Sequence, residues 1–188
     1  MTGKTGNSAR LGKTIVLVGM MGSGKTAVGT ALAHQLGVPF VDSDEEIERA
    51  AQMTVAEIFA RDGEPFFRAR ESEVIERLLS GPPGIVSTGG GAFVSDANRE
   101  LIARLGVSVW LKVDLELLWN RVRHKNTRPL LRTADPKKTL ATLLEGRVPA
   151  YSKAQIAVEA EEELSVSEMA AKVARALYDV PELFKEKV

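Results

Sequence analysis

Short apolar runs alternate with longer amphipathic segments along most of the chain. The runs, mostly β-branched and apolar at successive positions, are Ile15–Val18, Phe40–Val41, Ile85–Val86, Val107–Val113 and Ile156–Val158. Runs of this kind are typical of strands that are buried on both faces of a sheet. Helical patterns lie between and after them, near residues 25–36, 44–61, 64–79, 95–105, 114–124, 136–146 and 166–179. This alternation implies crossover connections, and therefore a parallel sheet covered by helices.

Two polar pairs mark helix starts. Ser95 and Asp96 precede one helical pattern, and Ser165 is followed three residues later by Glu168, which is a capping-box spacing.

The ends of the chain and one internal segment lack any hydrophobic period. Residues 1–12 are polar and Gly-rich, and we expect a disordered leader there. A single domain is expected over residues 13–180, with a C-terminal tail at 181–188. The polar, aperiodic segment at about 122–136 is expected to be a mobile lid.

Composition narrows the class of protein. With 188 residues, 44% of them hydrophobic, the chain suffices for one core. Lys and Arg balance Asp and Glu at 25 each, which argues against a nucleic-acid partner and a polybasic membrane anchor. The absence of cysteine excludes disulfides, a Cys-based zinc site and a thiol nucleophile. No apolar run approaches the roughly 18 residues of a membrane span and no signal peptide is apparent, so we expect a soluble cytoplasmic protein.

The first apolar run leads into Gly19-Met20-Met21-Gly22-Ser23-Gly24-Lys25-Thr26. Glycine is needed in such a loop because backbone N–H groups must approach phosphate oxygens closely, in conformations that a Cβ would hinder. The lysine supplies a cation to the β- and γ-phosphates, the threonine hydroxyl is a ligand for Mg²⁺, and the N-terminus of the following helix faces the same anion. We assign ATP binding to Gly22, Ser23, Gly24, Lys25, Thr26 and Ala27.

Gly-Lys-Thr occurs three times, which provides an internal control. The copy at residues 3–5 has no chain before it that could form a strand, and the copy at 12–14 has Asn7 where the first glycine belongs. Only the third copy has Gly19 five residues before Gly24 and a predicted strand before the loop. A guanine-reading Asn-Lys-x-Asp motif is absent, because no asparagine precedes Lys112 in Lys112-Val113-Asp114. The pattern therefore favours a kinase over a GTPase.

Asp42-Ser43-Asp44 follows the second predicted strand. Ligands of open parallel sheets lie beyond the carboxyl ends of the strands, so this pair of carboxylates is expected to face the same crevice as the glycine loop. One carboxylate would help to hold the water shell of a metal, and the other would contact a hydroxylated acceptor. The alternative is that Ser43 or Asp44 merely caps the next helix.

Two further segments suggest an acceptor site. Arg68 follows two aromatic residues near a predicted helix start, where an arginine forms either a fork for a carboxylate or an ordinary surface ion pair. Gly89, Gly90 and Gly91 follow the third predicted strand. Three consecutive glycines are entropically costly, which favours a close backbone approach to a ligand over a plain turn.

At this point the motifs resemble, in their order, those of the shikimate kinases. The blocks are GMMGSGKT at 19–26, DSD at 42–44, GEPFFRARE at 63–71 with STGGGA at 87–92, and NTRPLL at 126–131 with GRVPAY at 146–151. The resemblance covers residues 14–151. It implies a three-layer α/β/α fold with a five-stranded parallel sheet, of the P-loop NTPase and nucleoside monophosphate kinase type. The implied reaction is ATP-dependent phosphorylation of the 3-hydroxyl of shikimate in aromatic amino-acid (chorismate) biosynthesis, by a monomer that uses Mg²⁺.

The resemblance also implies roles on the acceptor side. Asp44 resembles the acidic residue that contacts the acceptor hydroxyls and serves as general base, and Asp42 resembles its partner, which supports Mg²⁺ through water. Arg68 and Arg147 resemble the pair that grips the shikimate carboxylate, with the backbone of residues 90–91 closing that pocket.

On the nucleotide side, Arg121 resembles the arginine that packs on adenine. Arg128 resembles the lid arginine that reaches the transferring phosphate, so Lys25, Asp44 and Arg128 form the implied catalytic set. One stretch departs from the family pattern, because Glu159-Ala160-Glu161-Glu162-Glu163 stands where members usually have a basic or proline-containing loop over the base. We expect a solvated turn there.

Other functions remain as alternatives. A gluconate kinase or another small-acid sugar kinase of the same fold would share the glycine loop but lack this combination of arginines and glycines. A nucleoside monophosphate kinase would need a longer lid. A regulatory module that has lost catalysis is disfavoured by the intact Lys25, Thr26, Asp42, Asp44 and Arg128.

Overall fold

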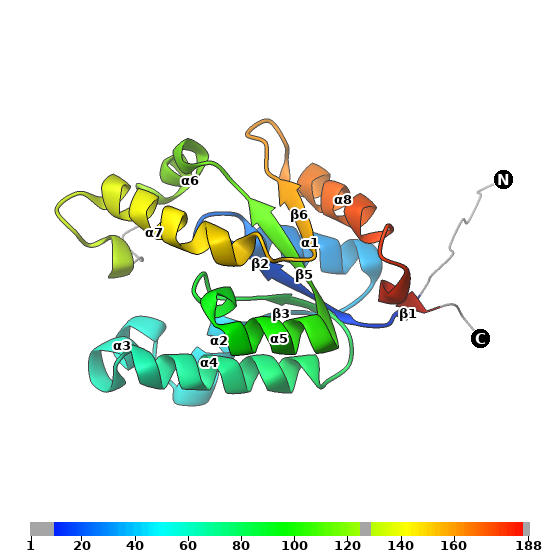
Figure 1. The fold of residues 1–188 in the computed structure, drawn as a ribbon, viewed down its shortest axis with the longest axis horizontal. Helices are drawn as coiled ribbons and strands as arrows, with labels where there is room; N and C mark the ends of the chain where they lie inside the picture. Colours follow the sequence, from blue (N-terminus) through cyan, green and yellow to red (C-terminus); the bar gives the residue numbers. More distant parts are fainter. Residues whose placement is uncertain (1–9, 125–128, 186–188) are drawn as a thin grey trace.

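A five-stranded parallel sheet forms the centre of the molecule (Figure 1). The structure is a computed structural model, and it describes residues 10–124 and 129–185. The sheet has the strand order β3-β4-β2-β5-β6, and all four pairings are parallel. Its strands are β2 (Thr14–Val18), β3 (Phe40–Asp42), β4 (Ile85–Ser87), β5 (Gly106–Lys112) and β6 (Ile156–Glu159). All five predicted strands are confirmed.

Helices cover both faces of the sheet, as Figure 1 shows. One face packs against α1 (Lys25–Leu36) and α8 (Val166–Leu177), and the other packs against α4 (Glu64–Leu79), α5 (Asp96–Leu105), α6 (Leu115–Val122) and α7 (Pro136–Tyr151). The central strand β2 shows how the sequence achieves this. Ile15 and Leu17 belong to the first core, whereas Val16 and Val18 belong to the second, because successive side chains of a strand point to opposite faces. The three-layer α/β/α fold is therefore confirmed.

The single helix predicted near residues 44–61 is two helices, α2 (Ser43–Ala51) and α3 (Val55–Asp62). Gln52 ends α2 in the left-handed conformation, with φ 52°. Thr54 then starts α3 with a capping box, in which its hydroxyl accepts from the Glu57 N–H and the Glu57 carboxylate accepts from the Thr54 N–H. The Ser/Thr-x-x-Glu signal was present at Thr54, and the continuous amphipathic pattern concealed it.

Other helix ends are close to their predicted positions, with one exception. Ser95 caps α5, and Ser165 caps α8 with the predicted capping box. Helix α7 continues to Tyr151 rather than stopping near residue 146. The helix tolerates Pro149, and the buried Ala150 and Tyr151 that follow bind its last turn to the core.

Parts of the expected leader and tail belong to the folded domain. Strand β1 (Arg10–Leu11) pairs antiparallel with β7 (Phe184–Lys185), and the Gly12 N–H donates to the Leu183 carbonyl at 2.7 Å. Leu11 and Leu183 are both buried in the core that contains α1 and α8. A two-residue ladder is too short to show a hydrophobic period, which is why the assignment of residues 10–12 and 181–185 to the ends was wrong.

Three short 3₁₀ turns complete the described chain: η1 (Ala92–Val94), η2 (Pro129–Leu131) and η3 (Pro181–Leu183). Within the described ranges, every helix is too short or too polar to cross a membrane. The carboxyl ends of β2, β3 and β4 carry the glycine loop, Asp42-Ser43-Asp44 and the three consecutive glycines, respectively. The fold therefore gathers these three motifs at one edge of the sheet.

Candidate active site

The loop between β2 and α1 has the geometry that its glycines predict. Gly22 and Gly24 adopt φ of 81° and 92°, in the left-handed region that side chains other than glycine rarely adopt. A Cβ on Gly22 would also lie only 2.6 Å from Cγ1 of Val122. The loop therefore needs glycine for both its conformation and its packing against α6.

The N-terminus of α1 is open to an anion. Its N-cap is Gly24, no side chain caps the helix, and its first turn carries no acidic residue. The first backbone N–H groups of the helix are thus left for another acceptor. Lys25 lies above the loop, where its Nζ donates to the carbonyl oxygens of Gly19 and Met20, both at 2.8 Å. This arrangement concentrates positive charge at one end of a cavity.

That cavity, the nucleotide cavity, has a volume of about 520 Å³. Its lining comprises Met21, Gly22, Ser23, Gly24, Lys25, Thr26, Ala27, Val28, Asp42, Asp44, Ser87, Thr88, Gly89, Gly90, Arg121, Ala160, Glu161, Leu164, Val166 and Met169. Arg121 lies over the loop, with its Nη1 donating to the Gly22 carbonyl at 3.3 Å. The structure therefore brings together all the predicted nucleotide-binding residues that it describes.

The acidic segment after β6 takes part in the same cavity. Ala160 and Glu161 line it, while Glu162 and Glu163 are exposed. Lys172 of α8 forms an ion pair with Glu161 and donates to the Glu159 carbonyl. Glu162 and Glu163, at the end of the segment, thus form the solvated turn that we expected.

Asp42 links the glycine loop to α2. Its Oδ1 accepts from the N–H groups of Asp44 and Glu45, at 3.0 and 3.4 Å, and so caps the helix. Its Oδ2 accepts from the hydroxyl of Thr26 at 3.1 Å. The helix cap is therefore Asp42, rather than Ser43 or Asp44, and this leaves the carboxylate of Asp44 available to the cavities.

Asp44 lies in an environment that disfavours its charge. Its Oδ1 is buried and has no hydrogen-bond partner among the described residues. Burial, reinforced by the nearby charges of Asp42 and Glu71, raises the pKa of Asp44 to about 7, although Lys25 opposes this shift. A carboxyl group with this pKa can accept a proton near neutral pH.

A second cavity of about 570 Å³, the acceptor cavity, adjoins the first. Its lining comprises Met21, Asp42, Asp44, Glu45, Glu48, Thr54, Val55, Ala56, Phe59, Phe67, Arg68, Glu71, Gly89, Gly90, Gly91, Leu130, Arg132 and Arg147. Met21, Asp42, Asp44, Gly89 and Gly90 line both cavities. A group bound in one cavity would therefore share a wall with a group bound in the other.

The three consecutive glycines make room for side chains of the site. A Cβ on Gly89 would lie 2.8 Å from Asp44 Oδ1 and 2.9 Å from Glu71 Oε1. A Cβ on Gly90 would lie 3.0 Å from Arg147 Nη1, and one on Gly91 would lie 2.7 Å from Arg68 Cζ. The positive-φ glycines of the described chain do not include these three, so space is the reason for them. The close approach in the structure is to side chains of the protein, and a close approach to a ligand stays a prediction.

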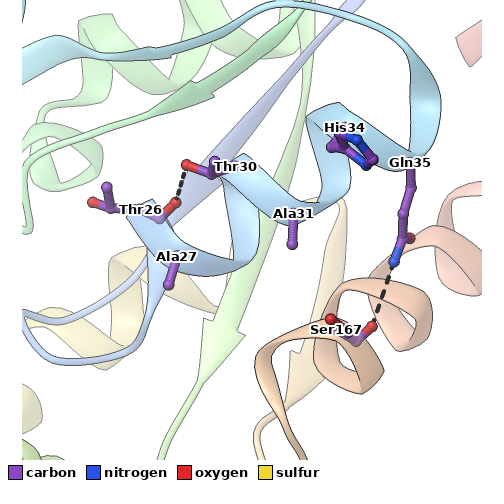
Figure 2. Close-up of a pocket in the computed structure, with 7 residues that line it drawn as sticks. All are labelled: Thr26, Ala27, Thr30, Ala31, His34, Gln35 and Ser167. Carbon is purple, nitrogen blue, oxygen red and sulfur yellow. Dashed lines mark hydrogen bonds between the residues drawn. The ribbon is translucent and has the colours of Figure 1, made fainter.

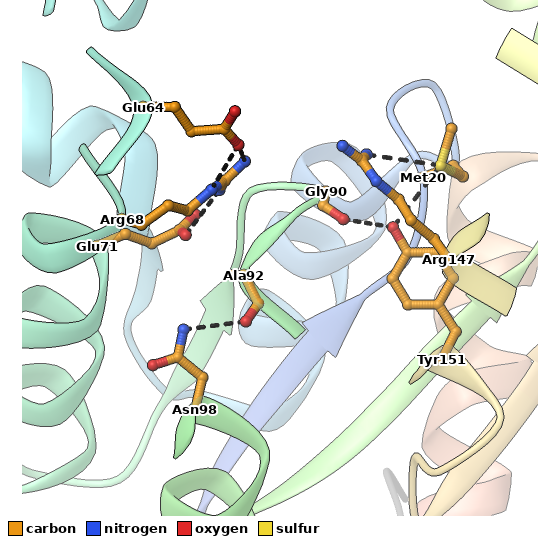
Figure 3. Close-up of polar contacts among 9 residues, drawn as sticks. All are labelled: Met20, Glu64, Arg68, Glu71, Gly90, Ala92, Asn98, Arg147 and Tyr151. Carbon is orange, nitrogen blue, oxygen red and sulfur yellow. Dashed lines mark hydrogen bonds and ion pairs between the residues drawn. The ribbon is translucent and has the colours of Figure 1, made fainter. Parts of the chain in front are cut away.

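Arg68 is held by two glutamates (Figure 3). Its Nη1 donates to Glu71 Oε2 at 2.7 Å, and its Nε and Nη2 donate to Glu64 Oε1 at 3.2 and 3.1 Å. Arg68 therefore forms the ion pairs that the sequence allowed, and it also lines the acceptor cavity. Its role as a fork for a ligand carboxylate stays a prediction.

Sequence reasoning missed Glu71. Its side chain is fully buried, and its Oε1 has no hydrogen-bond partner among the described residues. Burial raises the pKa of Glu71, and the charge of Arg68 opposes this shift. The signal in the sequence was a glutamate three residues after Arg68 on one helix face, a spacing that is usually a surface ion pair.

A third hollow lies along the outer face of α1, beside the start of α8 (Figure 2). Thr26, Ala27, Thr30, Ala31, His34, Gln35 and Ser167 line its volume of about 640 Å³. None of these is a carboxylate, and His34 is an exposed helix residue, as the sequence suggested. The charged groups of the site therefore lie in the other two cavities, despite the greater volume of this one.

The lid arginine and the metal site are the two remaining predicted parts of the site. Arg128 and three other residues of the lid sequence, at 125–127, lie outside the described residues. For a metal, no cluster of three or more His, Cys, Asp or Glu side chains occurs in the described part of the chain. The hydroxyl of Thr26 and the carboxylate of Asp42 nevertheless form the kind of sparse oxygen site that suits Mg²⁺, which keeps several waters and takes other ligands from phosphates.

Comparisons with known proteins agree with this geometry. A family model described as shikimate kinase matches residues 21–178. A shikimate kinase of Cereibacter sphaeroides is 62% identical over 177 residues, which cover 94% of this chain and 88% of the relative. One from Ruegeria pomeroyi is 63% identical over 172 residues, with 92% and 88% covered. Among solved structures, shikimate kinase from Acinetobacter baumannii in complex with shikimate superposes with a TM-score of 0.86 at 38% identity, covering 90% of this chain and 94% of that one.

Proposed function

The chain belongs to the shikimate kinase family, and from that premise we propose that it transfers the γ-phosphate of ATP to the 3-hydroxyl of shikimate. The reaction belongs to the biosynthesis of aromatic amino acids. The observation that carries the proposal is the pair of adjoining cavities, one built around a phosphate loop and the other around two arginines, with Asp44 in their common wall.

The nucleotide cavity supplies charge to the phosphates. Lys25 and the open N-terminus of α1 face the place where the β- and γ-phosphates would lie, and Arg121 would contact the base end of the nucleotide. Phosphoryl transfer depends on such positioning and charge neutralisation more than on covalent chemistry by the protein.

The acceptor cavity suits a small acid with several hydroxyls. Arg68 and Arg147, two of the three arginines that line it, offer cations that match a carboxylate. Asp44 Oδ1 and Glu71 Oε1 are buried acceptors without partners among the described residues, so hydroxyl groups of a ligand would satisfy them. A polyhydroxylated carboxylic acid therefore complements this cavity in both charge and hydrogen bonding.

Asp44 would act as the general base. Its carboxylate takes the proton from the acceptor hydroxyl, whose oxygen forms the new bond to the γ-phosphorus while the bond to the leaving ADP breaks. A pKa of about 7 places the proton acceptor near the pH at which it has to work.

Mg²⁺ would be held by the Thr26 hydroxyl directly and by Asp42 through water. When bound, it would neutralise charge on the β- and γ-phosphates. The assignment of Arg128 to the transferring phosphate rests on the sequence resemblance alone. A monomeric state and a cytoplasmic location also stay predictions.

A sugar-acid kinase of related fold is the principal rival. A gluconokinase from Sinorhizobium meliloti superposes with a TM-score of 0.59 at 24% identity, which is a likeness of fold alone. The family match and the arrangement of Arg68, Arg147 and residues 89–91 favour shikimate as the acceptor.

A release assay for ADP, run with the full chain and MgATP, tests the proposal. Shikimate should stimulate ADP release by roughly a hundredfold or more over gluconate, AMP or water, and phosphorus NMR should detect shikimate 3-phosphate. Lys25→Ala serves as the control for a contaminating kinase, because loss of this charge should lower turnover by roughly 10²–10³-fold while circular dichroism stays unchanged. Equal stimulation by gluconate, or unchanged turnover by folded Lys25→Ala, would contradict the assignment.

A further inference from the structure

One tyrosine connects the helix that carries Arg147 to the three consecutive glycines. Tyr151 is the last residue of α7, its side chain is fully buried, and its hydroxyl donates to the Gly90 carbonyl (Figure 3). Its ring packs against Trp110 of β5, with the ring centroids 5.8 Å apart. The hydroxyl is thus fixed by a rigid ring in the core rather than by a mobile surface side chain.

Tyr151 and Arg147 act on the same residue from the same helix face. They are four residues apart on α7, a spacing that places two side chains one above the other. Arg147 Nη1 would lie 3.0 Å from a Cβ on Gly90. Met20 of the phosphate loop lies between them, because its sulfur is 3.7 Å from both Arg147 Nη1 and the Tyr151 hydroxyl.

The Gly90 carbonyl matters because of the peptide plane to which it belongs. The carbonyl of residue 90 and the N–H of residue 91 point in opposite directions across a planar trans peptide. Consecutive glycines leave this plane free to rotate unless a hydrogen bond fixes it. Tyr151 holds the carbonyl end of this plane, and Gly91, at its other end, lines the acceptor cavity.

We propose that Tyr151 is a positioning residue of the acceptor site, which fixes the Gly90–Gly91 peptide and the Arg147 guanidinium for an acidic acceptor. The inference rests on the proposed function and deepens it. Burial raises the pKa of Tyr151 to about 12, partly offset by Arg147, so its hydroxyl remains a hydrogen-bond donor throughout the working range of pH.

Tyr151→Phe tests the proposal, because it removes the hydroxyl and keeps the ring. We expect the KM for shikimate to rise about three- to tenfold, which corresponds to the loss of one hydrogen bond, while kcat and the KM for ATP stay within about twofold. Calorimetric titration with shikimate alone should show the same weakening. Each variant is assayed well below its own Tm, so that a loss of stability does not mask the comparison.

Ser108→Ala is a matched control. It also removes a buried hydroxyl that bonds to the main chain, since Ser108 Oγ accepts from the Gln155 N–H at 3.0 Å, but Ser108 lines neither cavity. It should lower Tm and leave both KM values unchanged. An unchanged KM for shikimate in Tyr151→Phe, an equal rise in both KM values, or the same shift in Ser108→Ala would overturn the positioning role. Failure of the wild-type chain to use shikimate would instead overturn the proposed function.

Discussion

At the scale of single residues, the site depends on carboxyl groups that the fold keeps away from water. Asp44 has a raised pKa because burial and the neighbouring acids disfavour its ionised form. Burial of this carboxyl group therefore lowers the stability of the fold and also gives the site a base, a combination that is common at functional sites.

Asp44→Asn should separate these two effects. The substitution keeps the shape and removes the base, so we expect kcat to fall by roughly 10²–10⁴-fold. In the wild-type enzyme, kcat/KM for shikimate should rise with pH up to about 7, because Asp44 has to be deprotonated to act. Steady-state kinetics between pH 5.5 and 9 provide the measurement, and a near-normal kcat for the variant would exclude Asp44 as the essential base.

The same variant should be more stable than the wild type. Because the pKa of Asp44 is near 3.8 in the unfolded chain and about 7 in the folded one, the unfolded state loses its proton first as pH rises, and folding becomes less favourable between these values. Asn has no such cost. Thermal unfolding should therefore show a higher Tm for Asp44→Asn, with a larger gain at pH 8 than at pH 5. The free energy of unfolding should rise by about 1–3 kcal/mol at pH 8.

Not every residue of this site was visible in the sequence. The ends of the predicted strands pointed to Asp42, Asp44 and the three glycines, because parallel strands gather their carboxyl ends at one edge. Glu71 and Tyr151 gave no comparable signal. Glu71 is three residues from Arg68 on α4, a spacing usual for surface ion pairs, and only its burial sets it apart. For Tyr151, only a tertiary contact shows that it holds Gly90.

At the scale of elements, the turn after β4 is shaped by what surrounds it. Side chains of Asp44, Glu71, Arg147 and Arg68 lie within about 3 Å of where a Cβ on these glycines would be, so a larger residue would crowd them. Gly91 has φ −95°, which alanine adopts readily, so a substitution there tests space alone.

Gly91→Ala should displace the guanidinium of Arg68, since the new Cβ would lie 2.7 Å from Cζ. The loss of a charge-assisted contact with the acceptor should raise the KM for shikimate about ten- to a hundredfold, with little change in the KM for ATP. Gly146→Ala is the control. Gly146 lies next to Arg147 at an exposed position of α7, and a Cβ there would meet nothing within 4 Å. If both substitutions had the same effect on kinetics, crowding of Arg68 would not be the cause.

Element boundaries were predictable where one signal dominated. Helix α1 and helix α4 have the predicted ends, and the caps at Ser95 and Ser165 were read correctly. The break at Thr54 and the extension of α7 to Tyr151 were missed for opposite reasons. A capping box interrupted an amphipathic pattern that looked continuous, and burial of Tyr151 prolonged a helix past Gly146 and Pro149.

At the scale of the whole molecule, the two ends of the domain close the core jointly. Leu11 of β1 and Leu183 before β7 are both buried beside α1 and α8, and their strands pair with each other. A segment that looked like a polar leader therefore contributes to the stability of the entire domain.

Leu11→Ala should lower the free energy of unfolding by about 2–4 kcal/mol, the usual cost of removing a buried leucine side chain. Val94→Ala is the comparison, because Val94 is 43% exposed and its truncation should cost less than about 1 kcal/mol. Urea unfolding monitored by tryptophan fluorescence would measure both. A cost for Leu11→Ala no larger than that for Val94→Ala would show that β1 is dispensable.

The wall shared by the two cavities has a consequence for inhibition. Since Met21, Asp44, Gly89 and Gly90 border both spaces, a nucleotide analogue joined to a small hydroxylated acid needs only a short tether to fill both at once. For a short tether, the effective concentration of the second group is in the millimolar range, so two weak fragments combine into one strong ligand. Selectivity would come from the acid fragment, because Arg68 and Arg147 line the acceptor cavity and not the nucleotide cavity.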